Sequence, residues 1–446
     1  MTKLLALDVA ANCCSRETPH WHPHLTGGHM KRIMLGLIGA ALLLLVSAGE
    51  SYAIPAFSRK YKTSCSTCHY AAPMLNAFGK AFRNNGYRYP AGTDLEMTKE
   101  EPVSLGAEGQ KRAFPDAIWP ADIPGTSPFS VRAISRVNYQ AIGDVKWNLE
   151  LPHELELLYA ATIGENFSVF GEAEIENEGG ETEIAFPVFL QYDHSPGLHI
   201  RAGMVYADPT PTHLRLTRNH YNVASLRSRN GFRLRDDFAG LEVWGAMNGA
   251  DGRGGFTYRA GIVNGQGSLA DVNKEKDFYG RATYKIGGLG EIGGTEGSTS
   301  EVVDFFIDNS LTLGAFGYVG TASKAGSPDE DFQIYGGDAD FWYDRFILNG
   351  MVMFMNSDIT GKTDQKSFAY YAQGQYVLYP WLIGIVRYEW EDRDTDSDVV
   401  KPINSVIPAI TVMARANVKF ICEFKIPLDD ANKNKNTFTL QIEFGI

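Results

Sequence analysis

Cysteine is scarce in this chain, and the few that are present cannot build a disulfide framework. The 446 residues contain five cysteines. Cys13 and Cys14 lie in an N-terminal stretch that we expect the mature protein to lose, and Cys65 and Cys68 belong to one short motif. Only Cys422 then remains, so the sequence predicts no intramolecular disulfide framework.

Basic charge is also scarce. The chain has 41 Lys and Arg against 53 Asp and Glu, a formal net charge of −12, and no sustained basic stripe. Nucleic-acid-binding domains carry such a stripe, so we exclude nucleic acid as a partner. Glycine and aromatic residues are abundant instead, with 46 Gly, 21 Tyr and 25 Phe. This composition is typical of many short strands and turns, and not of helical bundles.

The N-terminal apolar run is too short to cross a membrane comfortably as a helix. It extends from Ile33 to Val46, whereas a transmembrane helix needs about 20 residues. Lys31 and Arg32 precede the run, and Ser51-Tyr52-Ala53 follows it as an A-x-A-like cleavage site. We therefore predict a secretory signal peptide at residues 30–53 and export of the mature chain.

Residues 1–29 lie in front of this signal. Their Cys13-Cys14 pair and four histidines could be read as a metal-binding tract. A charged segment normally begins a secreted protein, however, so we interpret residues 1–29 as an upstream extension from a mis-assigned start codon. Export is predicted under both interpretations.

One motif stands out against these absences, the run Cys65-Ser66-Thr67-Cys68-His69. C-x-x-C-H is the attachment signature of c-type haem: the two thiols lie on one side of a helical turn, and the adjacent imidazole can ligate the iron. A zinc site would need a second pair of ligands at ordinary spacing, and a thioredoxin-like pair would need a βαβ context. Neither follows, so we predict one covalently bound haem c.

The sixth ligand of the haem iron stays open in the sequence. Met74 follows His69 too closely to reach the opposite face of the ring, whereas Met97 has enough intervening chain and is our candidate. The alternatives are a methionine of the barrel, a histidine of the later chain, or no sixth protein ligand at all. The later histidines are His153, His194, His199, His213 and His220. Met/His ligation would raise the reduction potential.

The residues around the motif predict a haem module at 54–89 and a linker at 90–128. Leu75, Phe78 and Phe82 follow the spacing of one helical face, and Gly86 is expected to end that helix. So short a segment has little core of its own, and we expect this face to pack against the haem. Six prolines and a loss of periodicity between 90 and 128 indicate an extended linker.

From residue 129 to 446 the chain alternates apolar and polar residues, most clearly at 278–285, 368–377, 412–425 and 438–446. Strands of about ten residues separated by turns are what a transmembrane antiparallel β-barrel requires, because closed pairing satisfies every backbone group in lipid. We predict 16 strands, with 14 as the alternative. A soluble sandwich or propeller would bury its apolar face in a core, and no propeller-length repeat is present.

Carboxylates of two successive predicted strands form a candidate cation strip in the lumen. They share the polar phase of their strands: Glu150, Glu154 and Glu156 on the first, and Glu172, Glu174 and Glu176 on the second. Hard oxygen ligands suit Fe(II), and rings of carboxylates concentrate cations. The alternative is a solvated wall without a defined metal.

A long arginine-bearing connection at 207–238 is a second candidate. Planar guanidinium groups suit carboxylates, so these arginines could pair with haem propionates. The residues concerned are Arg227, Arg229, Arg233 and Arg235. A plain surface loop is the alternative.

The stretch around the motif resembles a known family. Residues 55–61 (PAFSRKY), 65–69 (CSTCH) and 73–87 (PMLNAFGKAFRNNGY) are similar to the N-terminus of the fused monohaem cytochrome-porins, whose best-known members are outer-membrane Fe(II) oxidases of iron-oxidising bacteria. The resemblance implies a small haem domain that plugs or enters a barrel in the bacterial outer membrane, with Cys65 and Cys68 bonded to haem and His69 on the iron. The remaining chain agrees with that family in length and barrel pattern only.

Three functions follow as hypotheses. The first is oxidation of extracellular Fe(II), one electron at a time, with electrons passing through the haem to periplasmic carriers; this would make the protein an oxidoreductase. The second runs electrons outward to extracellular acceptors. The third is a diffusion porin with a haem-bearing plug. The outer-membrane lipid is a predicted partner in all three.

Overall fold

The computed structural model describes residues 56–101, 103–104, 108–116, 122–144, 146–178, 181–207, 234, 237–265, 273–294, 306–323, 328–359, 361 and 364–446. All of them belong to one compact unit, Ser51–Ile446. The predicted upstream extension at 1–29 and signal peptide at 30–53 lie outside the described residues, as do the four arginines predicted to contact propionates.

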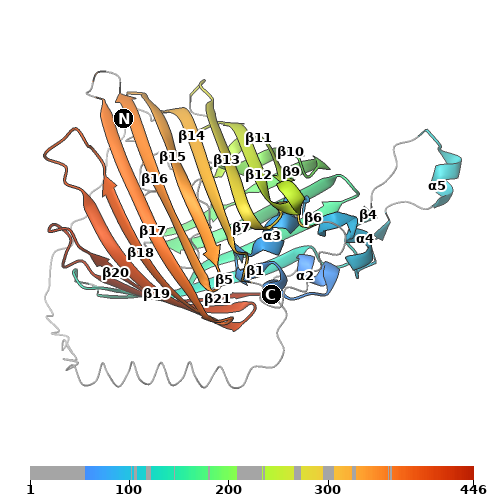
Figure 1. Cartoon of the computed structure of the whole chain (residues 1–446), viewed down its shortest axis with the longest axis horizontal. Coiled ribbons are helices and arrows are strands. Elements are labelled where there is room, and N and C mark those ends of the chain that lie inside the picture. The colour runs from blue at the N-terminus through green and yellow to red at the C-terminus, as the bar shows by residue number, and fades with distance from the viewer. Residues whose placement is uncertain are drawn as a thin grey trace, which may run out of the picture. The chain divides into compact units, whose positions relative to one another are not determined.

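The described chain forms a closed antiparallel barrel (Figure 1). The last strand pairs with the first, β21 with β5, and closes the sheet. The barrel strands are β5 (Phe129–Gln140), β6 (Trp147–Ile163), β7 (Phe167–Glu178), β9 (Val188–Ser195), β10 (Leu198–Tyr206), β11 (Asp237–Asn248), β12 (Arg253–Val263), β13 (Asp277–Leu289), β14 (Ser310–Ala322), β15 (Glu330–Tyr343), β16 (Phe346–Ile359), β17 (Gln365–Tyr379), β18 (Leu382–Asp392), β19 (Ile403–Arg415), β20 (Val418–Pro427) and β21 (Thr437–Gly445). The prediction of 16 strands is confirmed.

One short extra strand lies beside these sixteen. β8 (Glu181–Ala185) pairs with the end of β7, while β9 pairs with the beginning of β7 and carries the barrel onward. The ring of strands therefore closes through the pairing of β7 with β9, and β8 extends β7 at one rim. The sequence prediction did not include this strand.

Side chains alternate between lipid and lumen along each strand, because successive residues of a strand point to opposite faces. On β18, Val386 faces outward and is 56% exposed, whereas its neighbour Arg387 faces inward and is 0% exposed. The predicted faces of 278–285, 368–377 and 438–446 are confirmed in the same way. An apolar exterior around a polar interior is the arrangement of a transmembrane barrel.

The predicted alternating run 412–425 is not one strand. β19 ends at Arg415, a turn follows at Ala416 and Asn417, and β20 begins at Val418. The alternation continues in phase through this short turn, so the assignment of faces is correct although the run belongs to two strands. Alternation alone therefore cannot reveal a turn of two residues, because apolar and polar residues keep alternating through it.

The two ends of the barrel differ. At one end, short turns join most neighbouring strands, as between β9 and β10, β15 and β16, and β17 and β18, with the connection between β13 and β14 as the long exception, and the C-terminus lies there. At the other end the connections are longer, as at 207–236 and 393–402. Outer-membrane barrels have short periplasmic turns and longer extracellular loops, so the short-turn end faces the periplasm.

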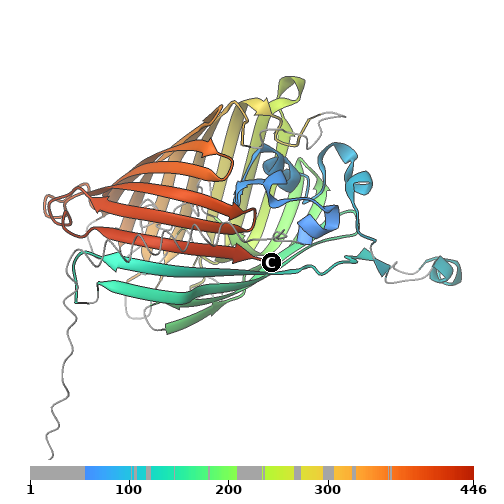
Figure 2. The same cartoon turned by 90° about the horizontal axis from the view of Figure 1, so that it is seen from below.

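The N-terminal residues lie at this periplasmic end, as Figure 2 also shows. Their elements are α2 (Ala56–Tyr61), η1 (Cys65–Thr67), β1 (His69–Ala71), β2 (Met74–Leu75), α3 (Ala77–Asn84), η2 (Pro90–Gly92), α4 (Asp94–Met97), β3 (Val103–Ser104), α5 (Glu108–Ala113) and β4 (Asp122–Ile123). No helix of the described chain has the length and apolar character needed to cross a membrane.

Helix α3 begins two residues later than its apolar spacing indicates. Asn76 caps it by accepting a hydrogen bond from the backbone N–H of Gly79 at 2.8 Å, so Leu75 lies in β2 and not on the helix. Phe78 and Phe82 do share its buried face. An asparagine side chain replaces the missing acceptor at a helix N-terminus, which fixes the start of α3 at Ala77.

The lipid-facing assignment is testable at Val386. A Val386→Arg substitution places a charge in the hydrocarbon and should lower the free energy of unfolding in bilayers by about 2–4 kcal/mol. Val399→Arg is the matched control, because Val399 is 89% exposed in the loop between β18 and β19. Urea titration in lipid vesicles measures both. Equal stability of the two variants would contradict the assigned faces.

Candidate functional site

The C-x-x-C-H run forms a single tight turn. Residues Cys65–Thr67 are a 3₁₀ helix, and the backbone N–H of Cys68 donates to the carbonyl of Cys65 at 3.1 Å. Ser64 accepts from the N–H of Ser66 at the start of the turn. The two thiols are thus presented from one turn of chain, as the spacing predicts. Burial raises the pKa of the Cys68 thiol to about 12, with Cys65 adding to the shift.

Asn76 holds this turn against α3, and sequence reasoning did not identify it. Its side-chain amide donates to the carbonyl groups of Ser66 and Thr67, both at 3.1 Å. Its backbone N–H donates to the carbonyl of Cys68 at 2.9 Å. Asn76 is 2% exposed. An Asn between Leu75 and Phe78, with the type of side chain that caps helices, was the signal available in the sequence.

Gly79 permits the close approach of α3 to the turn. A Cβ at this position would lie 2.1 Å from the carbonyl oxygen of Cys68, closer than any real contact. Any larger residue at Gly79 would therefore push the helix away from the cysteine turn. The Asn76 hydrogen bonds and the Gly79 contact together fix the cysteine turn on α3.

His69 is enclosed beside the two cysteines. Burial lowers its pKa to about 4, and this outweighs the backbone groups of Pro73 and Met74, which favour the protonated ring. The Nδ1 atom is buried and makes no well-formed hydrogen bond. The ring is therefore neutral at ordinary pH, and a neutral imidazole is the form that ligates metal ions.

An aromatic cluster surrounds Cys68. Tyr61, Phe78, Phe82 and Tyr89 are buried in it, and Cys68 packs against it. The rings meet closely, with centroids 4.7 Å apart for Tyr61 and Tyr89 and 5.3 Å apart for Phe78 and Tyr89. Such rings cover one side of the cysteine turn, where Cys68 is half-buried. Phe78 and Phe82, which the sequence predicts on one apolar face of the helix, thus lie in the cluster next to Cys68.

The candidates for a sixth ligand lie in different places. Met97, at the end of α4, packs against the same aromatic cluster as Cys68. Met74 is 3% exposed and packs on the lumen wall with Tyr70. His153 and His199 lie in polar networks of the barrel, described below, and His194 is exposed. His213 and His220 lie outside the described residues. Met97 stays a prediction.

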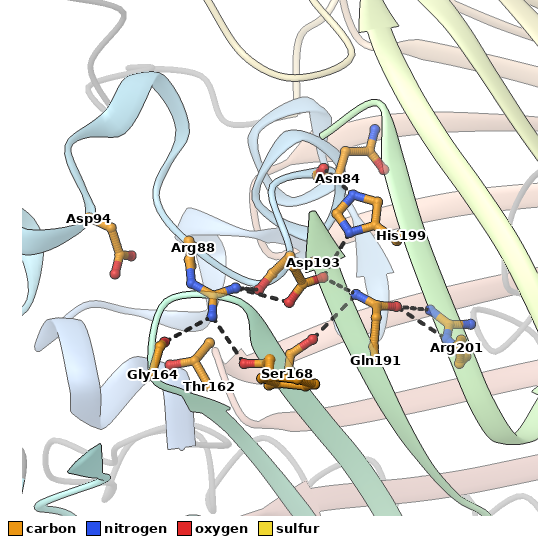
Figure 3. A network of polar contacts seen from close by, with 12 residues as sticks. Asn84, Arg88, Asp94, Thr162, Gly164, Ser168, Gln191, Asp193, His199 and Arg201 are labelled. Carbon is orange, nitrogen blue, oxygen red and sulfur yellow. Dashed lines mark hydrogen bonds and ion pairs between the residues drawn. The ribbon is translucent and has the colours of Figure 1, made fainter. Parts of the chain in front are cut away.

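A buried polar network joins the module to β9 and β10 (Figure 3). Arg88 forms an ion pair with Asp193 at 3.0 Å and donates to the carbonyls of Gly164 and Phe167 at 3.1 and 3.0 Å. His199 bridges the two parts: Nδ1 lies 2.7 Å from the Asp193 carboxylate and Nε2 lies 3.1 Å from the carbonyl of Asn84.

The network continues into the barrel wall. Gln191 donates to Asp193 at 2.6 Å and accepts from Arg201 at 2.9 Å and from the indole N–H of Trp244 at 3.0 Å. Trp244 stacks on His199 with ring centroids 4.1 Å apart. Each carboxylate oxygen of Asp193 thus has a donor, and the module is tied to three adjacent strands of the barrel.

Further contacts hold the module from other sides of the lumen. Lys419 on β20 donates to the carbonyl of Ala72 at 2.8 Å, and Lys80 on α3 pairs with Asp340 on β15 at 3.4 Å. Asn84 donates to the carbonyl of Glu291 at 2.7 Å. Figure 1 shows the corresponding helices at the mouth of the barrel. The module therefore contacts several walls of the periplasmic opening.

The predicted carboxylate strip is assembled by the register of β6 and β7, which pairs Glu154 with Glu176 and Glu156 with Glu174. Ligand oxygens of Glu154, Glu156 and Glu174 lie within 4.8 Å of one another. Glu172 stands opposite Leu158 on the same two strands. The six carboxylates are thus neighbours in the lumen, and their role as a cation strip stays a prediction.

Basic side chains that sequence reasoning missed lie among these carboxylates. Arg132 on β5 pairs with Glu154 at 3.0 Å and also with Glu156. His153 stands 3.0 Å from both Glu150 and Glu176, and Arg136 contacts its ring. The strip is partly neutralised by these groups. Arg132 and Arg136 lie on β5 at the alternate positions that face the lumen. This alternation was the signal in the sequence that could have placed both arginines beside the strip.

The closed pairing, the apolar exterior and the polar interior make this chain an integral β-barrel of the bacterial outer membrane. No protein-family model matches the sequence. No curated protein matches it either.

Solved structures of similar fold include three barrels. OmpT of Vibrio cholerae is 9% identical, with 77% of this chain and 100% of that chain covered and a TM-score of 0.48. OmpF of Salmonella typhi is 12% identical, with coverage of 73% and 98% and a TM-score of 0.48. An anion-selective porin from Comamonas acidovorans is 12% identical, with coverage of 72% and 100% and a TM-score of 0.48.

The docking network is testable at Asp193. Asp193→Asn leaves Arg88 and His199 without their carboxylate, and breaking a buried charge pair on one side costs on the order of 2–5 kcal/mol. Backbone amides of residues 77–89 should then exchange hydrogen faster, as measured by hydrogen exchange and mass spectrometry. Asp358→Asn, at an exposed position of β16, is the control. Unchanged exchange in Asp193→Asn would show that other contacts alone hold the module.

Proposed function

We propose that the protein is a monohaem cytochrome-porin that transfers electrons across the outer membrane, accepting them one at a time from extracellular Fe(II) and passing them to periplasmic carriers. The observation that carries this proposal is the C-x-x-C-H turn within the periplasmic mouth of the barrel. There, two thiols from one turn lie beside a half-buried imidazole whose Nδ1 atom is buried.

The residues at this turn suit a haem c by their chemistry. Cys65 and Cys68 would hold the group through thioether bonds, and His69 would ligate its iron. When bound, the haem supplies an iron that alternates between the ferric and ferrous states. Asn76 and Gly79 keep the cysteine turn in place, and the cluster of Tyr61, Phe78, Phe82 and Tyr89 covers one side of it.

The balance of charge inside the barrel favours a cationic donor. Among the buried polar residues of the described chain, thirteen are Asp or Glu and four are Lys or Arg, and four further carboxylates of this set are paired with the half-buried Lys80, Arg88, Arg201 and Arg281. A cleft lined by one sign of charge raises the local concentration of the opposite ion. The carboxylates of β6 and β7 belong to this acidic interior, and we propose them as the place where extracellular Fe(II) gathers, although Arg132 and Arg136 offset part of their charge.

The extracellular half of the lumen favours an electron conduit over an open pore. Apolar side chains of β13 to β17 face inward there, including Phe316, Met353 and Tyr371, and none of these is more than 9% exposed. Side chains that line a water-filled channel would be exposed. Together with the module at the periplasmic mouth, this apolar wall leaves little room for free diffusion of solutes.

The proposal is testable through the haem itself. Wild type should carry one covalent haem, seen by haem staining after denaturing electrophoresis and by mass, and Cys65→Ala with Cys68→Ala should abolish it. Cys422→Ala is the matched control and should retain the haem, because Cys422 lies on β20 outside the motif. Fe(II) added without oxygen should reduce the oxidised wild-type haem within minutes. A haem protein that shows no spectral change would disprove Fe(II) as the donor.

A diffusion porin is the second candidate, favoured by the closed barrel itself, whose inward-facing residues on β18, β20 and β21 include Glu389, Glu423 and Gln441 beside apolar residues. Liposome swelling separates the two functions. A plugged conduit should pass small sugars far more slowly than an open general porin does at equal protein content. Swelling at the rate of the open porin would favour the second candidate. An outward electron conduit would differ from the first candidate in the direction of electron flow, and the reduction potential of the haem would distinguish the two.

A further inference from the structure

One arginine of the module lacks an ionic partner. Arg83 lies on α3 between two paired basic residues: Lys80 pairs with Asp340 at 3.4 Å, and Arg88 pairs with Asp193 at 3.0 Å. Arg83 itself is half-buried and forms no ion pair with any residue that the structure describes. Taking a charge out of water is unfavourable unless a counter-charge or hydrogen bonds compensate for it. The guanidinium group of Arg83 therefore requires an explanation.

Two arginines of the barrel wall flank one indole ring, that of Trp244 on β11. The guanidinium carbon of Arg201 on β10 lies 5.6 Å from the centroid of this ring. Arg259 on β12 is directly paired with Trp244, so the two side chains project from the same face of the sheet. Trp244 faces the lumen, where it stacks on His199. Arg201 and Arg259 therefore share one area of the lumen wall.

The end of α3 lies on this area. The carbonyl oxygen of Asn84, the residue after Arg83, lies 3.1 Å from Nε2 of His199 (Figure 3). Because His199 stacks on Trp244, this contact places the helix end over the indole that the two wall arginines flank. Three guanidinium groups from three different elements thus gather at one place.

The three guanidinium groups are close enough to act on one another. Burial is the main cause that lowers the pKa of Arg83, and the charges of Arg201 and Arg259 act in the same direction. Tyr87 and Glu291 oppose them. Like charges in one place repel, so the cluster is unfavourable without an added negative charge.

The carboxylates of this area are already occupied. The two oxygens of Glu242 accept from Arg201 at 3.0 Å and from the Tyr279 hydroxyl at 2.7 Å. Glu291 accepts from the side chain of Asn84 at 3.2 Å. The three arginines thus exceed these two carboxylates by one positive charge.

The next arginine along the wall does not alter this balance. Arg281 on β13 is directly paired with Arg259, but its charge is neutralised by an ion pair with Asp338. The excess positive charge therefore belongs to the group formed by α3, β10 and β12.

The chemistry of these side chains specifies the ligand that they fit. A guanidinium group presents its N–H donors as a planar fork that matches two oxygens of a phosphate or carboxylate group. Arg201 donates three of its five N–H groups to Gln191 and Glu242 and retains two. All three arginines are half-buried, so part of each side chain stays accessible from the lumen. A small oxyanion accepts several such bonds at once and supplies the missing negative charge.

We propose that Arg83, Arg201 and Arg259 form a binding site for a small free oxyanion such as inorganic phosphate, between α3 and the lumen wall. The bound anion links the module to β10 and β12 and removes the repulsion among the three guanidinium groups. The site lies on strands other than those of the carboxylate strip, and it requires no haem. It can therefore stand or fail independently of the proposed function.

The test is titration calorimetry of the purified full-length protein with inorganic phosphate. Wild type should bind one phosphate, and Arg83→Gln should bind it about tenfold or more weakly, because charge-assisted hydrogen bonds are lost. Arg112→Gln is the matched control and should bind like wild type, since Arg112 is exposed on α5. Phosphate should also slow hydrogen exchange of the backbone amides of residues 77–84 in wild type but not in Arg83→Gln.

Three results would overturn the proposal. They are no phosphate binding by wild type, equal binding by wild type and Arg83→Gln, and an equal loss of binding in Arg83→Gln and Arg112→Gln, which would indicate unspecific attraction. Arg83→Lys keeps the charge and serves if the glutamine variant does not fold. An ammonium group cannot form the planar fork, so this variant should bind phosphate several-fold more weakly. Affinity equal to that of wild type would likewise overturn the assignment.

Discussion

The constraint on which the whole structure depends is that a backbone N–H or C=O in lipid must find its partner inside the protein. Closure of β21 onto β5 meets this constraint for every barrel strand, and it leaves the ring of sixteen strands without an edge. Closure also determines what the side chains can do. Every second residue faces lipid and has to be apolar, so all polar chemistry of the barrel is concentrated in the lumen.

That concentration explains how a module of few residues can be held so firmly. The segment from Ala56 to Tyr89 has a small aromatic core and little else of its own. Its position comes from charged and polar contacts to the lumen wall, with Arg88 on Asp193, Lys80 on Asp340 and Lys419 on a module carbonyl. Buried ion pairs contribute modestly to net stability but specify one arrangement. The barrel thereby orients the C-x-x-C-H turn.

The lumen itself has two characters, and both matter for an electron conduit. Carboxylates outnumber basic groups among its buried polar residues, which favours cations near the protein. Apolar side chains of β13 to β17 close part of the extracellular half. A barrel with such an interior can admit a charged donor at its mouth without becoming a free passage for solutes. The haem would then connect this interior to carriers in the periplasm.

Local patterns determined much of this protein. Alternation of period two is a property of neighbouring residues, so the barrel and its faces could be read from the sequence. The same holds for the turn at Cys65–Thr67, because three residues suffice to form it. The number of 16 strands rested also on the even strand number of such barrels, with 14 as the alternative. Only the tertiary structure decided the extra strand β8, the turn at Ala416 and Asn417, and the pairing of the Glu strip with Arg132 and His153. Each depends on register between strands, and register is set by contacts between residues that the chain keeps far apart.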